Sequence, residues 1–268
     1  MSEGDRLPRG VDPTVPNIAR MYDYALGGKD NLAVDRAAME QIFGVVPYGP
    51  RPALENRAFL GRTVRFLTEA GIRQFLDLGS GLPTQGNVHE VAHEVAPETR
   101  GVYIDYDPVA ISHSRALLSG VDNFDAAQAD MRRPDEILSD PTVTAMIDFT
   151  RPTAVLLAAV LHSVTDDEDP AGIVGRLREA MAPGSYVVIS HITSHEQPAE
   201  YVTHVRKVFD QAREPMVPRS RDEILRFFDG FELVEPGLVA APDWRPEEAD
   251  NDDQPPTGFI LGGVGVVR

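Results

Sequence analysis

Gln74-Phe-Leu-Asp-Leu-Gly-Ser-Gly-Leu-Pro83 is the stretch of sequence that decides the fold. A short apolar run that ends in an acidic residue and a tight glycine turn predicts a buried strand leading into a helix. Val102-Tyr-Ile-Asp-Tyr-Asp107 predicts a second strand, which ends in carboxylates. Asp105 follows Gly81 at close to the roughly 20 residues expected for one strand–helix–strand step. The pair of strand ends suits a nucleoside ligand, because one end admits close backbone approach and the other offers a carboxylate to the ribose.

Composition places the chain among soluble globular proteins. Its 268 residues are enough for one large α/β domain, with 42% hydrophobic and 25% charged residues. The formal charge of −17 argues against DNA as a partner, because phosphate backbones are bound by clustered Lys and Arg. Without cysteine there is neither a disulfide framework nor a thiolate metal site. No signal peptide and no run of ~20 apolar residues is recognisable, so we expect a cytoplasmic protein without membrane association.

The pattern along the chain predicts three segments. Residues 1–16 are rich in Pro, Gly and charge and are expected to form a flexible N-terminal arm. Residues 17–72 have helical spacing, interrupted at Gly27-Gly28 and in the proline-rich stretch 46–52, and predict a helical extension or lid. Asp30 is the candidate cap of the second helix in this extension. Residues 73–268 alternate strand and helix patterns and predict the core domain.

The fold class predicted for the core is α/β, a doubly wound and mainly parallel sheet covered by helices on both faces. Strands are expected at 73–78, 101–106, 124–129, 153–160, 185–191, 231–238 and 258–267. Helices are expected between them at 87–96, 108–119, 134–148, 170–182, 196–213 and 221–229. An acidic, proline-rich loop without a helix joins the last two strands, so we expect these two to pair antiparallel.

The glycine turn is the first part of the predicted ligand site, which involves Asp77, Gly79, Ser80 and Gly81. In open α/β sheets ligands bind beyond the carboxyl ends of the strands, where the strand order reverses. Glycines at positions 79 and 81 remove side chains that would block a ligand. The third glycine of a dinucleotide fingerprint is missing, and a bound pyrophosphate would need that full pattern. A nucleoside without phosphates does not need it, and an ordinary strand-to-helix turn is the alternative.

Carboxylates at two further strand ends complete this predicted site. Asp105, followed directly by Tyr106 and Asp107, is the candidate for the ribose hydroxyls. Asp107 precedes Pro108, so its alternative role is the N-cap of the next helix. Asp130 could accept from an adenine amino group while Met131 covers a ring face. The alternative for Asp130 is a cap of the helix after Pro134.

His162 is the candidate for proton transfer. It follows the predicted strand 153–160 and would suit an acceptor that must lose a proton, although a structural histidine with satisfied hydrogen bonds is the alternative. His89 and His93 have helical spacing but no third ligand, so we expect a helix face and no metal site.

The polar segment at residues 20–31 is the other candidate for function. Its two adjacent glycines could be the hinge of a lid whose Tyr22, Lys29, Asp30 and Asn31 meet cofactor or acceptor. We place Tyr22 with the catalytic candidates and Lys29 with the cofactor contacts. The alternative is a capped corner between two helices whose tyrosines pack on the sheet.

These strings resemble the actinobacterial S-adenosylmethionine-dependent methyltransferase family that was long catalogued as a domain of unknown function. The resemblance runs from about Pro13 to Trp244. It is carried by Ile18-Ala-Arg-Met-Tyr-Asp-Tyr-Ala-Leu-Gly-Gly-Lys-Asp-Asn31, Arg73-Gln-Phe-Leu-Asp-Leu-Gly-Ser-Gly-Leu-Pro-Thr-Gln-Gly-Asn-Val-His-Glu-Val91, Asp105-Tyr-Asp-Pro108, Val160-Leu-His162 and Ala182-Pro-Gly-Ser-Tyr186. It implies the seven-stranded class I methyltransferase fold with an antiparallel last strand. It also implies S-adenosylmethionine bound by the Gly79–Gly81 turn, Asp105 and the Asp130-Met131 pair.

A methyltransferase of this kind needs little catalytic machinery. A sulfonium methyl group is already activated, so the enzyme mainly aligns an acceptor and excludes water. The chain lacks an Asn/Asp-Pro-Pro-Tyr/Phe string after its fourth predicted strand, which disfavours methylation of adenine or glutamine amino groups. We therefore expect a small-molecule acceptor, and the acidic composition favours a neutral or cationic one.

Two other functions stay open at this point. One is a non-catalytic binding or regulatory protein that keeps the fold and the cofactor. The other is a nicotinamide-dependent oxidoreductase, which the missing third glycine disfavours. A homodimer is a possible assembly.

Overall fold

The structure is a computed structural model that describes residues 12–83, 86–212, 214–247 and 254–268. Most of the arm predicted at residues 1–16 therefore lies outside the described residues. The strands are β1 (Gln74–Leu78), β2 (Arg100–Asp105), β3 (Phe124–Gln128), β4 (Ala154–Ala158), β5 (Tyr186–Ile192), β6 (Glu232–Leu233), β7 (Val239–Ala240) and β8 (Ile260–Val266). The helices are α1 (Ile18–Ala25), α2 (Ala33–Phe43), α3 (Arg51–Glu69), α4 (Val88–Val95), α5 (Pro108–Leu117), α6 (Pro134–Leu138), α7 (Pro141–Met146), α8 (Pro170–Ala180), α9 (Ala199–Phe209) and α10 (Arg221–Leu225).

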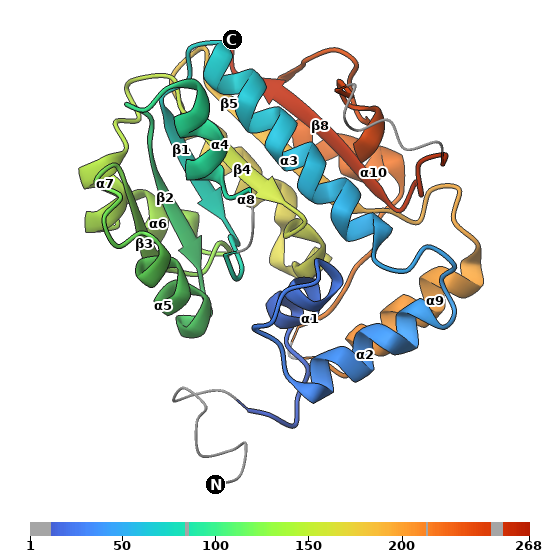
Figure 1. Ribbon diagram of the computed structural model, residues 1–268. Coiled ribbons are helices and arrows are strands. Elements are labelled where there is room, and N and C mark those ends of the chain that lie inside the picture. The colour runs from blue at the N-terminus through green and yellow to red at the C-terminus, as the bar shows by residue number, and fades with distance from the viewer. Residues whose placement is uncertain (1–11, 84–85, 213, 248–253) are drawn as a thin grey trace, which may run out of the picture.

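All strands belong to one sheet in the order β3-β2-β1-β4-β5-β8-β6, with β7 paired to β8 (Figure 1). Strands β1 to β5 are mutually parallel, and β8 runs antiparallel to β5. Strand β6 pairs antiparallel with β8, which confirms the pairing expected of the last two predicted strands. The strand order reverses between β1 and β4, so a ligand is expected beyond the carboxyl ends of these two strands.

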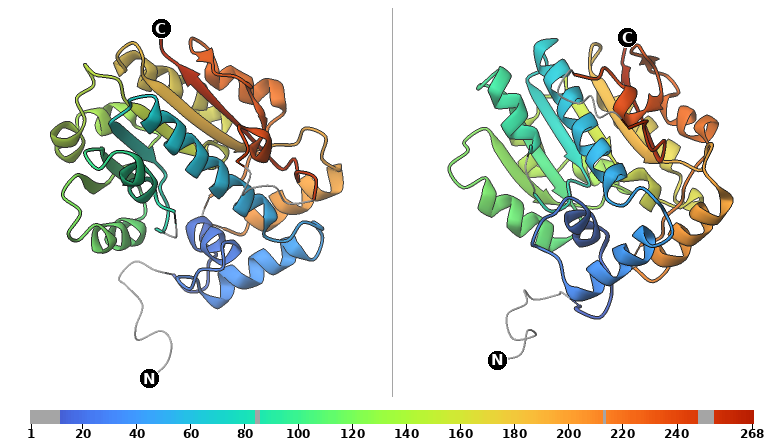
Figure 2. Two further views of the ribbon diagram at one scale, coloured as in Figure 1. Left: turned by 45° about the horizontal axis from the view of Figure 1, so that its top comes forward. Right: turned by 45° about the vertical axis from the view of Figure 1, so that its right-hand side comes forward.

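Helices cover both faces of the sheet (Figures 1 and 2). Phe75 of β1 packs in an apolar cluster with residues of α3, α4 and α5, whereas its neighbour Leu76 packs with residues of α6, α7 and α8. Both side chains are fully buried. This burial on two sides explains why the strand sequences read as continuous apolar runs rather than as alternating patterns.

Helices α1, α2 and α9 lie beyond the carboxyl ends of the strands (Figures 1 and 2). They form a third apolar cluster, to which Met21, Ile42 and Phe209 belong. An ion pair between Arg20 Nε and the fully buried Asp35 Oδ2, 2.6 Å long, joins α1 to α2. This layer therefore packs as a unit over the end of the sheet where the strand order reverses.

Two local predictions were wrong. The segment expected as one strand at 231–238 forms β6 and then a turn, because Pro236 has no backbone N–H and Gly237 adopts a φ of +89°. The short strand β7 follows this turn. Asp30 does not cap α2, which begins after Leu32. There the Asp35 carboxylate accepts the N–H of Leu32 at 2.8 Å instead.

Candidate functional site

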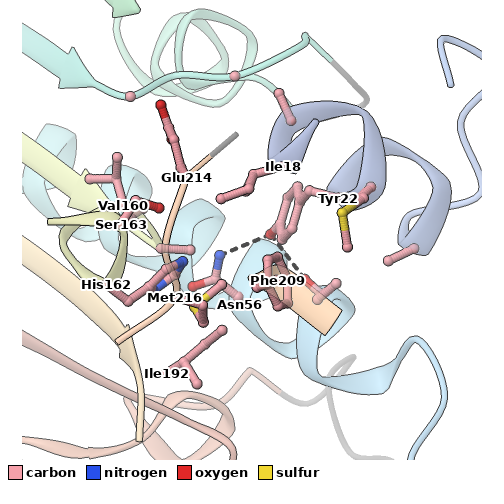
Figure 3. A pocket seen from close by; sticks show the side chains of 18 of the residues that line it. Ile18, Tyr22, Asn56, Val160, His162, Ser163, Ile192, Phe209, Glu214 and Met216 are labelled. Carbon is pink, nitrogen blue, oxygen red and sulfur yellow. Dashed lines mark hydrogen bonds between the residues drawn. The ribbon is translucent and has the colours of Figure 1, made fainter. Parts of the chain in front are cut away.

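One continuous pocket lies at the carboxyl ends of β1 and β4 (Figure 3). We call the part lined by residues 77–82, 105–107 and 129–132 the turn half. We call the part lined by α1, α2, α9, Met216 and Phe259 the helix half. Residues 158–163 after β4, residues of α3 and Glu214 also line the pocket. The turn half contains the predicted contacts Asp77, Gly79, Ser80, Gly81, Asp105, Tyr106, Asp107, Asp130 and Met131.

The glycine turn after β1 has little room for side chains. Gly79 and Gly81 have φ angles of +71° and +64°, which favour glycine. A Cβ at position 79 would lie 2.1 Å from Cγ2 of Val160, so a larger residue would have to displace that side chain. The Oγ of Ser80 is buried and has no hydrogen-bond partner among the described residues, and Ser80 lines the pocket. An unpaired buried hydroxyl beside this turn is the donor that a polar ligand would satisfy.

Asp105 closes β2 and is buried at the edge of the same turn. Its Oδ2 accepts the N–H of Gly81 and its Oδ1 accepts the N–H of Asp107, each at 2.8 Å. Burial raises the pKa of Asp105 to about 6, although these two hydrogen bonds lower it. Each carboxylate oxygen can accept a second hydrogen bond, so Asp105 both holds the glycine turn and can take ribose hydroxyls.

The buried Asp77 lies within electrostatic reach of the half-buried Arg57, and only Asp77 was predicted from the sequence. Burial raises the pKa of Asp77 to about 7, while the positive charge of Arg57 lowers it and Asp105 raises it. Arg57 comes from α3, lines the pocket and donates from Nη2 to Asn87 Oδ1 at 3.1 Å. A guanidinium at this place is suited to a carboxylate of a ligand. Sequence reasoning missed Arg57, because the spacing of α3 identifies only its apolar face.

Asp107 has the capping role that was its alternative reading. Its Oδ1 accepts the N–H of Val109 at 2.8 Å and so caps α5. Its Oδ2 accepts from Nδ2 of Asn17, at the start of α1, at 3.1 Å. Asp107 therefore ties the N-terminal helices to the turn half of the pocket.

Tyr106 connects the pocket to the segment between α9 and α10. Its hydroxyl is hydrogen-bonded to Glu214. Burial raises the pKa of Glu214, although the bond from Tyr106 lowers it. Met216 from the same segment is buried and faces the helix half (Figure 3). The sequence carries no sign of either contact, since this segment has no helical or strand pattern.

Asp130 and Met131 line the turn half as predicted from their position after β3. Asp130 accepts from both Nε and Nη2 of Arg132 at 2.8 Å. Burial raises the pKa of Asp130, but the bonds from Arg132 outweigh this and hold it below its usual value. Asp130 is not the cap of α6, because Arg133 occupies that position.

Tyr22 lies in the pocket wall with its hydroxyl already engaged (Figure 3). The hydroxyl accepts from Nδ2 of Asn56 at 2.9 Å and donates to the carbonyl of Ala53 at 3.2 Å. Asn56 Oδ1 in turn accepts from Ser190 Oγ at 2.5 Å. Burial raises the pKa of Tyr22, so its hydroxyl stays protonated. This arrangement makes Tyr22 a positioning residue rather than a proton acceptor.

Lys29, Asp30 and Asn31 lie outside the pocket, and Lys29 is exposed. The buried Asp23 carboxylate accepts the N–H of Asp30 at 2.9 Å and Nδ2 of Asn31 at 2.8 Å. The polar residues around the glycine pair thus close the corner between α1 and α2. That is the alternative reading of this segment, and it leaves Lys29 without contact to the turn half.

His162 is buried in the turn after β4, with 3% of its surface exposed. Its Nδ1 has no hydrogen-bond partner within the described part of the chain, and the residue lines the pocket. The ring packs edge-on against His191 at 5.5 Å, and Arg219 Nη1 lies 3.0 Å from His191 Nε2. Burial, with His191 and Arg219 nearby, holds the pKa of His162 well below its usual range. His162 is therefore a neutral imidazole.

The two histidines of α4 each have a protein partner. His89 Nδ1 is 2.8 Å from the Tyr103 hydroxyl, and His93 Nε2 is 2.9 Å from the carbonyl of Thr99. Within the residues that the structure describes, no group of three or more His, Asp or Glu residues is arranged to hold a metal ion.

The sheet order, the antiparallel β8 and the glycine turn beside a carboxylate at the end of β2 define a class I, Rossmann-like S-adenosylmethionine-dependent methyltransferase. The sequence profile of the S-adenosyl methyltransferase family matches residues 5–268, so the chain belongs to this family. S-Adenosylmethionine is its methyl donor. No curated protein matches the sequence.

Solved structures agree with this assignment. A candidate methyltransferase from Thermobifida fusca is 43% identical, with a TM-score of 0.91 over 98% of this chain and 99% of that one. A DUF574-family protein from Streptomyces avermitilis is 38% identical, with a TM-score of 0.91 over 96% of this chain and 99% of that one. Mitomycin 7-O-methyltransferase is 17% identical with a TM-score of 0.53 over 97% of this chain and 74% of that one, and it shares the fold.

Proposed function

We propose that this protein transfers the methyl group of S-adenosylmethionine to a small-molecule acceptor held in the helix half. The observation that carries the proposal is the single pocket, which joins the glycine turn to a chamber between α1, α2 and α9. A donor in one half and an acceptor in the other would meet inside one enclosed space. Enclosure matters because it aligns the reactants and excludes water.

The turn half supplies a group for each part of the donor. The Gly79–Gly81 turn would leave room for the methionine part of S-adenosylmethionine. Ser80 Oγ, which has no partner among the described residues, would hydrogen-bond to this part of the donor. Asp105 would accept from the ribose, and Asp130 with Met131 would contact the adenine. Arg57 would bind the methionine carboxylate, a role that sequence reasoning did not assign. When bound, the donor supplies an already activated methyl group.

The chain's own residues then have to orient the acceptor and manage its proton. Tyr22 and Asn56 form a fixed wall through their mutual hydrogen bond, which limits how an acceptor can turn. His162 offers a neutral ring nitrogen without a protein partner. It would accept the proton that an acceptor loses, and it belongs with the catalytic residues on this proposal.

Residues 17–72 would act as the lid of the core domain at 73–268. The hydrogen bond between Asn17 and Asp107 would link α1 to the site of the ribose. Gly27, with a φ of +79° and no described atom within 4 Å of an added Cβ, would provide a hinge. Opening at this place would admit both ligands, and closure would exclude water.

Isothermal titration with S-adenosylhomocysteine and transfer of a labelled methyl group to a panel of small molecules test the proposal. We expect binding in the micromolar range and label in an acceptor. Binding without transfer to any compound would favour the regulatory alternative. Absence of binding by folded protein would overturn the proposal, and binding of NADH instead would revive the oxidoreductase.

We further propose that the protein works in the cytoplasm without DNA as a partner, and that it forms a homodimer. Among the described helices, none has the length and the apolar character that crossing a bilayer requires. Light scattering of the purified protein tests the dimer, and fractionation of producing cells tests the location.

A further inference from the structure

The helix half is a chamber with apolar walls. Side chains of α1, α2, α9 and the end of β5 line it together with residues from two loops: Met21, Ala25, Met39, Ile42, Phe43, Ile192, Val205, Phe209, Met216 and Phe259. Several of these side chains, such as Met21 at 1% and Phe259 at 5% exposure, are buried although they face a cavity. A chamber of this kind gains binding free energy from an apolar ligand, at about 25 cal/mol per Å2 of apolar surface removed from water.

Formal charge is absent from the helix walls of this chamber. The residues of α1, α2 and α9 that line the pocket include no Asp, Glu, Lys or Arg. Among the described residues, the charged groups that line the pocket are Asp77, Asp105, Asp107, Asp130 and Arg132 of the turn half, with Arg57 of α3 and Glu214. Carboxylates therefore predominate at the mouth of the chamber and would repel an anionic acceptor.

His162 and Ser163, which follow β4, bring hydrogen-bonding groups to the pocket. Tyr22 and Asn56 already bond to each other, to Ala53 and to Ser190. Of the buried side-chain N and O atoms without a partner in the described residues, two line the pocket. One is Ser80 Oγ in the turn half and the other is Nδ1 of His162. Figure 3 shows the His162 ring beside Met216 and Asn56.

We infer that the acceptor is an uncharged, mainly apolar compound with a phenol-type hydroxyl, which is methylated on oxygen while the unpaired nitrogen of His162 takes its proton. This inference rests on the proposed function and specifies its substrate class. An apolar body matches the chamber walls, and its hydroxyl can hydrogen-bond to the His162 ring, whose Nδ1 has no partner among the described residues. A phenol fits better than an alkyl alcohol because a neutral, deeply buried imidazole is a weak base, and phenols give up a proton more easily.

The proposed methyl transfer balances in atoms and in charge. The O–H bond of the acceptor breaks and its proton moves to His162, while the oxygen forms a bond to the methyl carbon. The carbon–sulfur bond of the donor breaks and its electron pair stays on sulfur. The positive charge thus moves from sulfur to the imidazole ring without a change in the total charge. At sulfur, the carboxylates of Asp77 and Glu214, which line the pocket, would stabilise this charge. At the ring, Arg219 and His191 oppose it, which is a further reason for an acceptor that gives up its proton easily.

Binding measurements test this inference separately from transfer. With saturating S-adenosylhomocysteine, the wild-type protein is titrated with phenol and 2-naphthol, and with benzoate, 2-naphthoate and naphthalene as matched compounds. We expect the two hydroxyl compounds, and 2-naphthol above all, to bind at least tenfold more tightly than their carboxylate counterparts. We also expect 2-naphthol to bind more tightly than naphthalene by about three- to tenfold, the contribution of one hydrogen bond.

A matched pair of variants assigns the hydroxyl to His162. His162→Phe keeps the ring but removes both nitrogens, so the preference for 2-naphthol over naphthalene should disappear and transfer to 2-naphthol should be lost. His113→Phe, on α5 outside the pocket, should change neither. Unchanged affinity for S-adenosylhomocysteine shows that a variant is folded. If His162→Phe does not fold, His162→Leu, which also removes both nitrogens, is measured in the same way.

Three results would overturn the inference while leaving the methyltransferase assignment intact. The first is tighter binding of benzoate and 2-naphthoate than of phenol and 2-naphthol. The second is that neither hydroxyl compound binds at 1 mM, about the level of a very weak complex. The third is that a His162 variant still prefers 2-naphthol to naphthalene as strongly as the wild type does. Failure of S-adenosylhomocysteine itself to bind would overturn the proposed function instead.

Discussion

The two halves of the pocket are built in different ways. The turn half is made by short stretches that directly follow β1, β2 and β3, and each stretch carries its functional residue at the strand end. The helix half combines the N-terminal helices α1 and α2 with α9 and the segment before α10, which lie far from them in the sequence. These parts meet mainly through apolar packing, and an ion pair between Arg20 and Asp35 joins α1 to α2. On the proposed assignment of the two halves, donor recognition depends on local sequence, whereas acceptor recognition depends on how the outer helices pack.

The largest effect is expected at Gly79, on which the turn half depends. Gly79→Val should reduce affinity for S-adenosylhomocysteine at least ~100-fold, because the new side chain meets Val160 and requires an unfavourable positive φ. Isothermal titration measures this effect. Gly120→Ala is the control, since Gly120 also has a positive φ, +94°, but no atom within 4 Å of an added Cβ. Comparable losses in both variants would show that strain alone, and not the tight turn, is responsible.

A smaller loss is expected when the carboxylate at the end of β2 is neutralised. Asp105→Asn should weaken binding of S-adenosylhomocysteine by roughly 1–3 kcal/mol, because an ionised acceptor for ribose hydroxyls and for the Gly81 N–H is replaced by an amide. Asp122→Asn at an exposed position is the matched control. An affinity equal to that of the wild type would move the ribose to Asp107.

The pH dependence of binding should follow the same carboxylate. Burial raises the pKa of Asp105 to about 6, so the ionised form is lost as the pH falls through that value. We expect affinity for S-adenosylhomocysteine to fall by up to about tenfold per pH unit below pH 6, measured by titration calorimetry between pH 5 and 8. Asp105→Asn should flatten this profile.

Stability should change with pH in the opposite direction to binding. The pKa of Asp77, about 7 in the folded protein, lies above its unfolded value, so the folded state holds this proton more tightly. The free energy of unfolding of the ligand-free protein should therefore decrease as the pH rises from about 4 to 7. Asp77→Asn should remove part of this decrease, by roughly 1–3 kcal/mol in urea unfolding. A profile that this substitution leaves unchanged would contradict the desolvation of Asp77.

The smallest effects on binding and stability are expected for substitutions in the helix half and in the exposed corner beside it. Tyr22→Phe removes the partner of Asn56 and should lower the free energy of unfolding by about 1 kcal/mol while leaving donor binding unchanged. Its effect on methyl transfer should be several-fold, as expected for positioning.

Lys29→Ala should change donor binding less than about twofold, since Lys29 is exposed and outside the pocket. A tenfold loss in Lys29→Ala would mean that the corner closes over the donor.

Much of the turn half follows from sequence because its determinants are adjacent in the chain. In a parallel sheet, the carboxyl ends of neighbouring strands lie side by side at one edge. Gly79, Asp105 and Asp130 each stand at or just after such a strand end, so the sequence could place them together. The mainly parallel sheet and its antiparallel end also followed, from the alternation of strands with helices and from the missing last helix. In contrast, the many polar residues around Lys29 suggested ligand contacts. In the structure, Asp30 and Asn31 donate hydrogen bonds to Asp23 instead and so close the corner between α1 and α2.

The sequence by itself determined the fold class, the donor and the turn that receives it, since these depend on short-range backbone geometry. Only the tertiary structure decided that Arg57 and Glu214 reach the pocket, that the Tyr22 hydroxyl is already bonded, and that a nitrogen of His162 is not. The physical reason is that hydrogen-bond satisfaction and burial depend on every element packed around a group. A residue's spacing shows which face it occupies, but not whether another side chain has already taken its proton or lone pair.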